Sequence, residues 1–196
     1  MSENKIKYGL SHVAYAIVTE TTTSGVTTSS YGTVTDLKGA VNLSLSSSGS
    51  KSVFRADNED YYVSYGQGGF EGTLEVARVN DKFLKDVFGM VEDNDKILVE
   101  SSSSFNQVTY FALLFQFEGD QNETLHCLYK VSASRPDIAS QTTGEGGSIE
   151  PQTETLNITA VPRVDADKYI HLQTTDATST AVVSAWYTAV PVPTFT

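Results

Sequence analysis

The feature that most constrains this sequence is a pair of strongly apolar runs, 110–117 and 125–131, separated by a polar Gly-Asp-Gln-Asn segment. This pattern predicts a β-hairpin. Side chains alternate across a strand, so one face of the first run holds four apolar residues: Phe111, Leu113, Phe115 and Phe117. The opposite face, with Ala112 and Leu114, is also largely apolar. Such a hairpin must be buried on both sides, and we expect another copy of the chain to cover its second face.

Composition narrows the classes of protein further. The 196 residues suit a single domain spanning residues 1–196. With 13 Lys and Arg against 24 Asp and Glu, the net charge is -11, which excludes nucleic-acid binding by phosphate neutralisation. The one cysteine, Cys127, is interpreted as a small buried apolar side chain that forms no intrachain disulfide. No run approaches the roughly 20 apolar residues of a membrane span.

Strand patterns dominate the rest of the chain. Alternation predicts strands over 12–19, 41–45, 71–79 and 153–161, with Leu74 and Val76 facing inward in the third. One helix is predicted over 81–88, capped by Asn80 or Asp81 and ended by Gly89. Two polar segments without periodicity, 20–30 and 46–60, are predicted to be loops, the first mobile and the second long enough to be functional. The predicted fold class is mainly β, an antiparallel sandwich or barrel with one flanking helix.

The sequence offers little support for catalysis. Nucleophilic catalysis needs a base beside a nucleophile, but the histidines (His12, His126 and His171) are interpreted as ordinary strand residues, and no Gly-x-Ser-x-Gly motif occurs. Two acidic clusters lack the spacing of a calcium loop and are interpreted as solvated: Asp57, Glu59 and Asp60, and Glu92, Asp93 and Asp95. We therefore expect no enzyme activity, no metal and no cofactor.

Besides self-assembly, the residues leave two functions open. Tyr61, Tyr62 and Tyr65 would suit a sugar-stacking platform, as in a carbohydrate-binding β-sandwich of a receptor-binding apparatus. A hydrolase that uses a carboxylate pair, Asp57 and Asp60, would need catalytic turnover that depends on both residues.

A series of short blocks in a fixed order resembles a known family. The blocks are Lys7-Tyr-Gly-Leu10, Gly39-Ala-Val-Asn-Leu-Ser-Leu45, Phe54-Arg-Ala-Asp-Asn58, Phe70-Glu-Gly-Thr-Leu-Glu75, Asp81-Lys-Phe83, Asp86-Val-Phe-Gly89, 111–120, 126–129, 134–136, 150–163 and Trp186. In this order and spacing they resemble the major tail protein, or tail tube protein, of bacteriophages with long non-contractile tails.

The resemblance implies a structural virion protein with the phage tail-tube fold and no catalytic step. Six copies would form a ring whose inner strands join into a β-barrel, and rings would stack into a tube. That tube would enclose the tape-measure protein and later conduct DNA, which it would contact only transiently and without sequence specificity. Its other partners would be the tail terminator or head connector and the distal tail proteins. Assembly would take place in the host bacterial cytoplasm, without a membrane, and no immunoglobulin-like decoration domain is expected.

The resemblance also implies candidate assembly residues. The segment from about Ser46 to Asp60 would reach a neighbouring ring, which makes candidates of Ser46, Ser50, Lys51, Phe54, Arg55 and Asp57. Glu71 and Glu75 lie on the outward face of a predicted strand and are candidates for the lumen. Carboxylates there would repel passing phosphates, over a range that salt limits to about 8–10 Å. The Ser/Thr-rich segment 20–30 has no counterpart in the family pattern.

Overall fold

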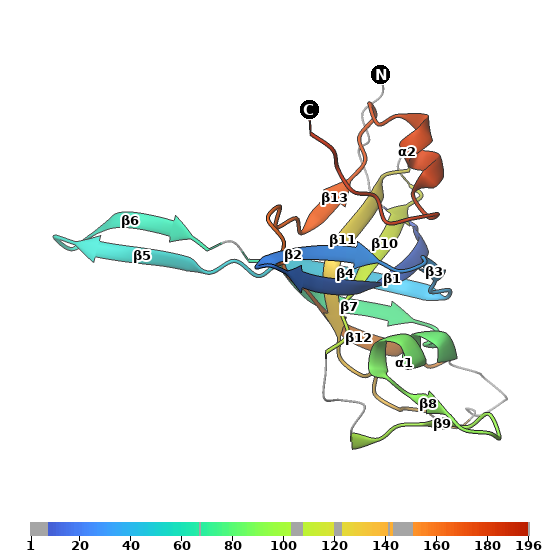
Figure 1. Cartoon of the computed structure of the whole chain (residues 1–196). Coiled ribbons are helices and arrows are strands. Elements are labelled where there is room, and N and C mark those ends of the chain that lie inside the picture. The colour runs from blue at the N-terminus through green and yellow to red at the C-terminus, as the bar shows by residue number, and fades with distance from the viewer. Residues whose placement is uncertain are drawn as a thin grey trace.

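The computed structural model of this chain describes residues 8–66, 68–102, 108–119, 123–140, 142 and 151–195. The fold is mainly β and antiparallel, with a flanking helix, as predicted (Figure 1). The strands are β1 (Leu10–Thr23), β2 (Val26–Tyr31), β3 (Thr35–Asp36), β4 (Ala40–Ser47), β5 (Lys51–Ala56), β6 (Glu59–Tyr65), β7 (Phe70–Val76), β8 (Val91–Glu92), β9 (Leu98–Val99), β10 (Phe111–Phe117), β11 (Leu125–Ala133), β12 (Glu154–Ala160) and β13 (His171–Gln173). The helices are α1 (Asp81–Phe88) and α2 (Thr180–Ala185), of which the second was not predicted.

One nine-stranded sheet forms the body, in the order β2-β1-β10-β11-β12-β7-β4. β3 pairs with β1, and β13 pairs with β11 beside the stretch that β12 uses. The predicted apolar hairpin is β10 and β11, and it lies in the middle of this sheet. The sheet curls so that β4 comes back against β1 without hydrogen bonding to it.

The concave side of the sheet holds the main core. The inward residues of the predicted strands meet there: Val13, Tyr15, Leu74, Val76, Phe111, Leu113, Phe115, Leu128, Val131, Leu156 and Ile158. Helix α1 adds Phe83, Val87 and Phe88 to this core. The hydroxyl of Tyr15 donates to Asp86 Oδ2 over 2.8 Å, which ties β1 to the helix. The predicted inward positions of Leu74 and Val76 on β7 are confirmed.

Helix α1 begins and ends where its sequence predicts. The side chain of Asn80 accepts a hydrogen bond from the backbone N–H of Phe83 at 2.7 Å, and the helix ends at Gly89, whose φ is 66°. A left-handed residue at this position is a common helix terminator, and glycine adopts it without steric cost. Of the two predicted caps, Asn80 is the one used.

The second face of the β10–β11 hairpin is covered by the same chain. Ala112, Leu114, Cys127 and Tyr129 pack there with Trp186 and Val190 of the C-terminal segment. The hydroxyl of Tyr129 also donates to the carbonyl of Pro191 over 2.8 Å. The expectation that another copy covers this face was therefore wrong: the pattern indicated double burial correctly, but not which residues provide the cover.

The expected mobile loop at 20–30 was also wrong. β1 continues to Thr23 and pairs with β2 across a turn at Ser24 and Gly25, both with positive φ. Thr and Ser side chains fit a strand because β-branched residues favour the extended backbone, so the polar composition did not exclude pairing.

A β-bulge changes one predicted strand face. β4 pairs Ala40 with Val76 and Asn42 with Glu75, so the register shifts between them. Val41 falls at this irregularity and is 53% exposed, whereas Leu43 and Leu45 are partly buried against the core. An extra residue in one strand breaks the simple alternation on which the prediction depended.

Candidate assembly surfaces

The predicted long loop at 46–60 is a β-ribbon that stands away from the body (Figure 1). We call it the arm and define it as residues 51–65, the antiparallel strands β5 and β6 with their turn. Asp57 and Asn58 form the turn with φ of 51° and 66°. Two successive residues with positive φ are typical of the tight hairpin turns that Asn and Asp favour. The loop prediction was wrong because the turn lacks glycine and residues 46–60 are mostly polar and lack a clear apolar alternation.

The arm exposes apolar side chains on both faces. Phe54 pairs with Tyr62 across the ribbon, and these side chains are 61% and 62% exposed. The next pair, Val53 with Val63, lies on the opposite face. β5 and β6 make only slight contact with the other described elements. An isolated two-stranded ribbon is marginally stable in water, so this arm is suited to packing against a partner.

The six residues predicted for a neighbouring ring divide between the arm and its root. Lys51, Phe54 and Arg55 lie on β5 and Asp57 at the tip, whereas Ser50 lies at the root and Ser46 belongs to β4. The structure thus separates Ser46 from the others: its hydroxyl donates to the carbonyl of Glu71 within the sheet. Arg55 Nε lies 3.0 Å from Asp60 Oδ1, so Asp60 forms an ion pair within the ribbon rather than a pair with Asp57.

A second candidate surface is the outward face of β12, β7 and β4. Glu71 and Glu75 lie on it, as predicted, with Thr73 between them. Their cross-strand neighbours are all small or polar: Asn42, Ser44, Ser46, Thr155, Asn157 and Thr159. On the same side of the sheet, the part over β10 and β11 is apolar and covered by the C-terminal segment. The outward face is thus polar where that segment does not cover it.

The sheet ends in two strands that each have one hydrogen-bonded neighbour among the described elements. β4 pairs with β7, and β2 pairs with β1. Unpaired strand edges offer N–H and C=O groups to another chain. The edges lie at opposite ends of the strand order, so a contact between them would be head to tail.

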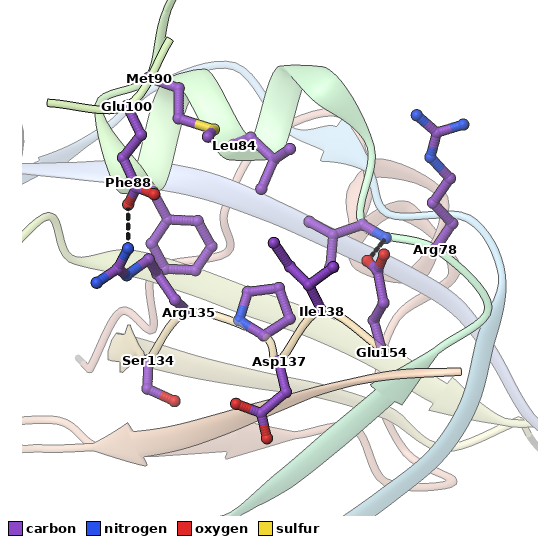
Figure 2. Close-up of a pocket in the computed structure, with 12 residues that line it drawn as sticks. Arg78, Leu84, Phe88, Met90, Glu100, Ser134, Arg135, Asp137, Ile138 and Glu154 are labelled. Atoms are coloured by element: carbon purple, nitrogen blue, oxygen red, sulfur yellow. Dashed lines mark hydrogen bonds and ion pairs between the residues drawn. The ribbon is translucent and has the colours of Figure 1, made fainter. Parts of the chain in front are cut away.

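A cleft of about 560 Å³ lies between α1 and the segment after β11. Figure 2 shows Leu84, Phe88 and Ile138 around it. Arg135 Nη1 contacts Glu100 Oε1 at 2.6 Å, and Glu154 Oε2 accepts from the Val79 N–H at 2.6 Å. Arg78, Met90 and Asp137 also line the cleft. Sequence reasoning missed this cleft because its residues come from distant segments without a shared motif.

The second predicted acidic cluster has structural partners. Glu92 accepts hydrogen bonds from Lys85 and Lys96, and these lower its pKa. Asp93 Oδ1 accepts from the backbone N–H groups of Asp95 and Ile97, at 2.9 and 2.8 Å, and so closes a turn. No group of three or more metal-ligating side chains occurs within the described ranges.

Two of the three histidines lie side by side on the sheet. His126 Nδ1 and His171 Nε2 lie 3.0 Å apart across β11 and β13, and the His126 ring stacks on Phe115. His12 lies on β1 and is exposed. In the part of the chain that the structure describes, no helix has the length and apolarity needed to cross a bilayer.

Comparison with known proteins finds a structural likeness but no match by sequence. No protein-family model matches the chain, and no curated protein matches it. Among solved structures, a chain of the cryo-EM structure of the anti-feeding prophage baseplate, 6-fold symmetrised, covers 91% of this chain and 100% of its own length. The identity is 11% and the TM-score is 0.45, a likeness too weak to carry an argument about function.

Proposed function

We propose that this chain is a non-catalytic structural virion protein that assembles into stacked hexameric rings, which form the tube of a phage tail. The arm is the observation that carries the proposal. Its exposed aromatic pair, Phe54 and Tyr62, and its slight contact with the body suit a projection that is completed by a neighbour. The ordered sequence blocks that resemble tail tube proteins support the same function.

The sheet supplies the lateral contacts in this proposal. The edges of β4 and β2 differ from each other, so joining them between copies is heterologous and closes into a ring when the rotation permits. The polar face then lines the lumen and presents Glu71 and Glu75. Carboxylates facing a passing DNA backbone keep it from adhering to the wall, within roughly one Debye length.

The proposed partners follow from this role. Copies of the chain contact one another within and between rings. The inside of the tube contacts the tape-measure protein, and its ends contact the tail terminator or head connector and the distal tail proteins. DNA contacts are transient and non-specific. Assembly takes place in the bacterial cytoplasm and the product belongs to the virion.

Negative-stain electron microscopy of the purified protein over a range of concentrations tests the proposal. We expect rings or tubes from the native chain. The carbonyl of Ser50 accepts from the Gly66 N–H at 2.7 Å, so deleting residues 51–65 and joining Ser50 to Gly66 should preserve the body. This variant should fold but not stack, while Val182→Ala, at an exposed residue of α2, should stack normally. A native chain that remains monomeric under all conditions would contradict the proposal.

A carbohydrate-binding module is the second candidate, because Tyr61 and Tyr62 are 76% and 62% exposed on the arm. Exposed aromatic faces can stack on sugar rings. Glycan-array binding that is lost in Tyr62→Ala would favour this function. Tube formation without glycan binding would favour the structural one.

A further inference from the structure

We propose that the arm of one copy docks in the α1 cleft of another copy, with Phe54 and Tyr62 as its anchors. The inference rests on the proposed assembly function and identifies the receiving surface. The receiving surface consists of six cleft residues: Arg78, Leu84, Phe88, Met90, Asp137 and Ile138.

The topology places the arm and the start of the cleft at opposite ends of the body. β4 runs from Ala40 to Ser47 and continues into the arm, whereas β7 runs back from Phe70 to Val76 and leads to Arg78 and α1 (Figure 1). An arm that extends away from its own cleft therefore projects toward a copy stacked in the same orientation. Head-to-tail repetition of such a contact produces an open stack rather than a closed dimer.

The two surfaces match in apolar character. The arm presents Phe54 and Tyr62 on one face, both mostly exposed. The cleft is lined by Leu84, Phe88 and Ile138, and Ile138 is fully exposed in the single chain. Aromatic anchors that fill an apolar pocket are the usual centre of a protein interface. A volume of about 560 Å³ is within the range of pockets that accept groups of this size.

The charges around both surfaces are complementary. The tip of the arm carries Asp57 and Glu59, neither of which has a cationic partner among the described residues, and Lys51 lies near the root. At the cleft, the one ion pair of Arg78 among the described residues is an exposed contact of 3.6 Å to Asp81, and Asp137 lies on a different side from Arg78 (Figure 2). Placing the tip near Arg78 and the root near Asp137 pairs opposite charges at both ends. Such pairs contribute little affinity but set orientation.

Disulfide trapping tests the contact. The native Cys127 should not take part in cross-linking, because it is buried and burial raises the pKa of its thiol to about 12. Two cysteines are introduced together, Tyr62→Cys in the arm and Ile138→Cys in the cleft. Mild oxidation of the assembled protein should give a ladder of covalent multimers on a non-reducing gel. In the matched control, Tyr62→Cys is combined with Val182→Cys, at a residue 44% exposed on α2, and should give at least tenfold less multimer.

The outcomes separate this inference from the proposed function. Tubes that form normally but cross-link no better than the control pair would overturn the arm–cleft contact and leave the tube function standing. A native chain that forms no rings or tubes would overturn both. Charge reversal gives a second measurement without cysteines: Arg78→Glu should impair stacking, and Glu59→Arg in the same chain should restore it. Failure of the restoration, with both variants folded, would also count against the contact.

Discussion

Replacing Trp186 by Ala should reveal how strongly the C-terminal segment holds the second face of the central hairpin. Trp186 is 1% exposed and packs with Ala14, Leu114 and Tyr129. A tryptophan buries about 150–250 Å², which at about 25 cal/mol per Å² corresponds to about 4–6 kcal/mol. Its Nε1 is buried and finds no hydrogen-bond partner among the described residues, so removing it regains about 1–3 kcal/mol. We expect a net loss of about 3 kcal/mol in the free energy of unfolding.

Denaturant unfolding, followed by circular dichroism, would measure this loss. Val182→Ala is the control, because Val182 is 44% exposed on α2 and should change stability by less than about 0.5 kcal/mol. Trp186→Phe should lose less than Trp186→Ala, since Phe keeps most of the apolar area and has no N–H to satisfy. If Trp186→Ala were as stable as the control, the hairpin would not depend on this segment for its cover, and the packing argument would fail.

Three other substitutions or reagents test particular contacts. Gly72→Ala should weaken the β4–β7 pairing and lower the melting temperature, because its β-carbon would overlap the carbonyl oxygen of Ser44; an unchanged melting temperature would contradict this. Asp165→Ala should cost about 3–5 kcal/mol in denaturant unfolding, since it leaves the buried Arg163 unpaired, and a loss below 1 kcal/mol would refute that pairing. Burial raises the pKa of Cys127 to about 12, so iodoacetamide at pH 8 should alkylate it only after unfolding. As the pH rises above the ordinary thiol pKa, Cys127 ionises in the unfolded chain but stays protonated in the folded one. The free energy of unfolding should therefore fall as the pH rises. Rapid alkylation of the native chain would contradict that burial.

The main core was predictable because its signals are local. The alternation in β7 and β12 and the stripe of α1 place their apolar residues inward, and Asn80 and Gly89 mark the helix ends. These patterns follow directly from side-chain geometry along a strand or a helix. The sequence therefore predicted the fold class, although not the short α2.

The errors occurred where local chemistry was ambiguous or where distant segments meet. Residues 46–60 turn at Asp57 and Asn58 without glycine, and the 20–30 hairpin consists mainly of Thr and Ser, so both segments resembled loops. Cover for the hairpin by Trp186 could not be inferred, because periodicity indicates that a face is buried but not what buries it. The positions of Glu71 and Glu75 on an outward face were predicted correctly, whereas the cleft beside α1 depends on tertiary contacts that no single stretch encodes.

The cover provided by Trp186 and Val190 has a consequence for biosynthesis. The ribosome makes β10 and β11 well before it makes these two residues. Chains emerge at about 5–20 residues per second, so the apolar surface of the hairpin stays uncovered for seconds. During that interval the nascent chain is prone to aggregation, and a chaperone that binds exposed apolar surface would protect it. Native packing of this molecule is thus completed late in translation or after it, when its last core residues arrive.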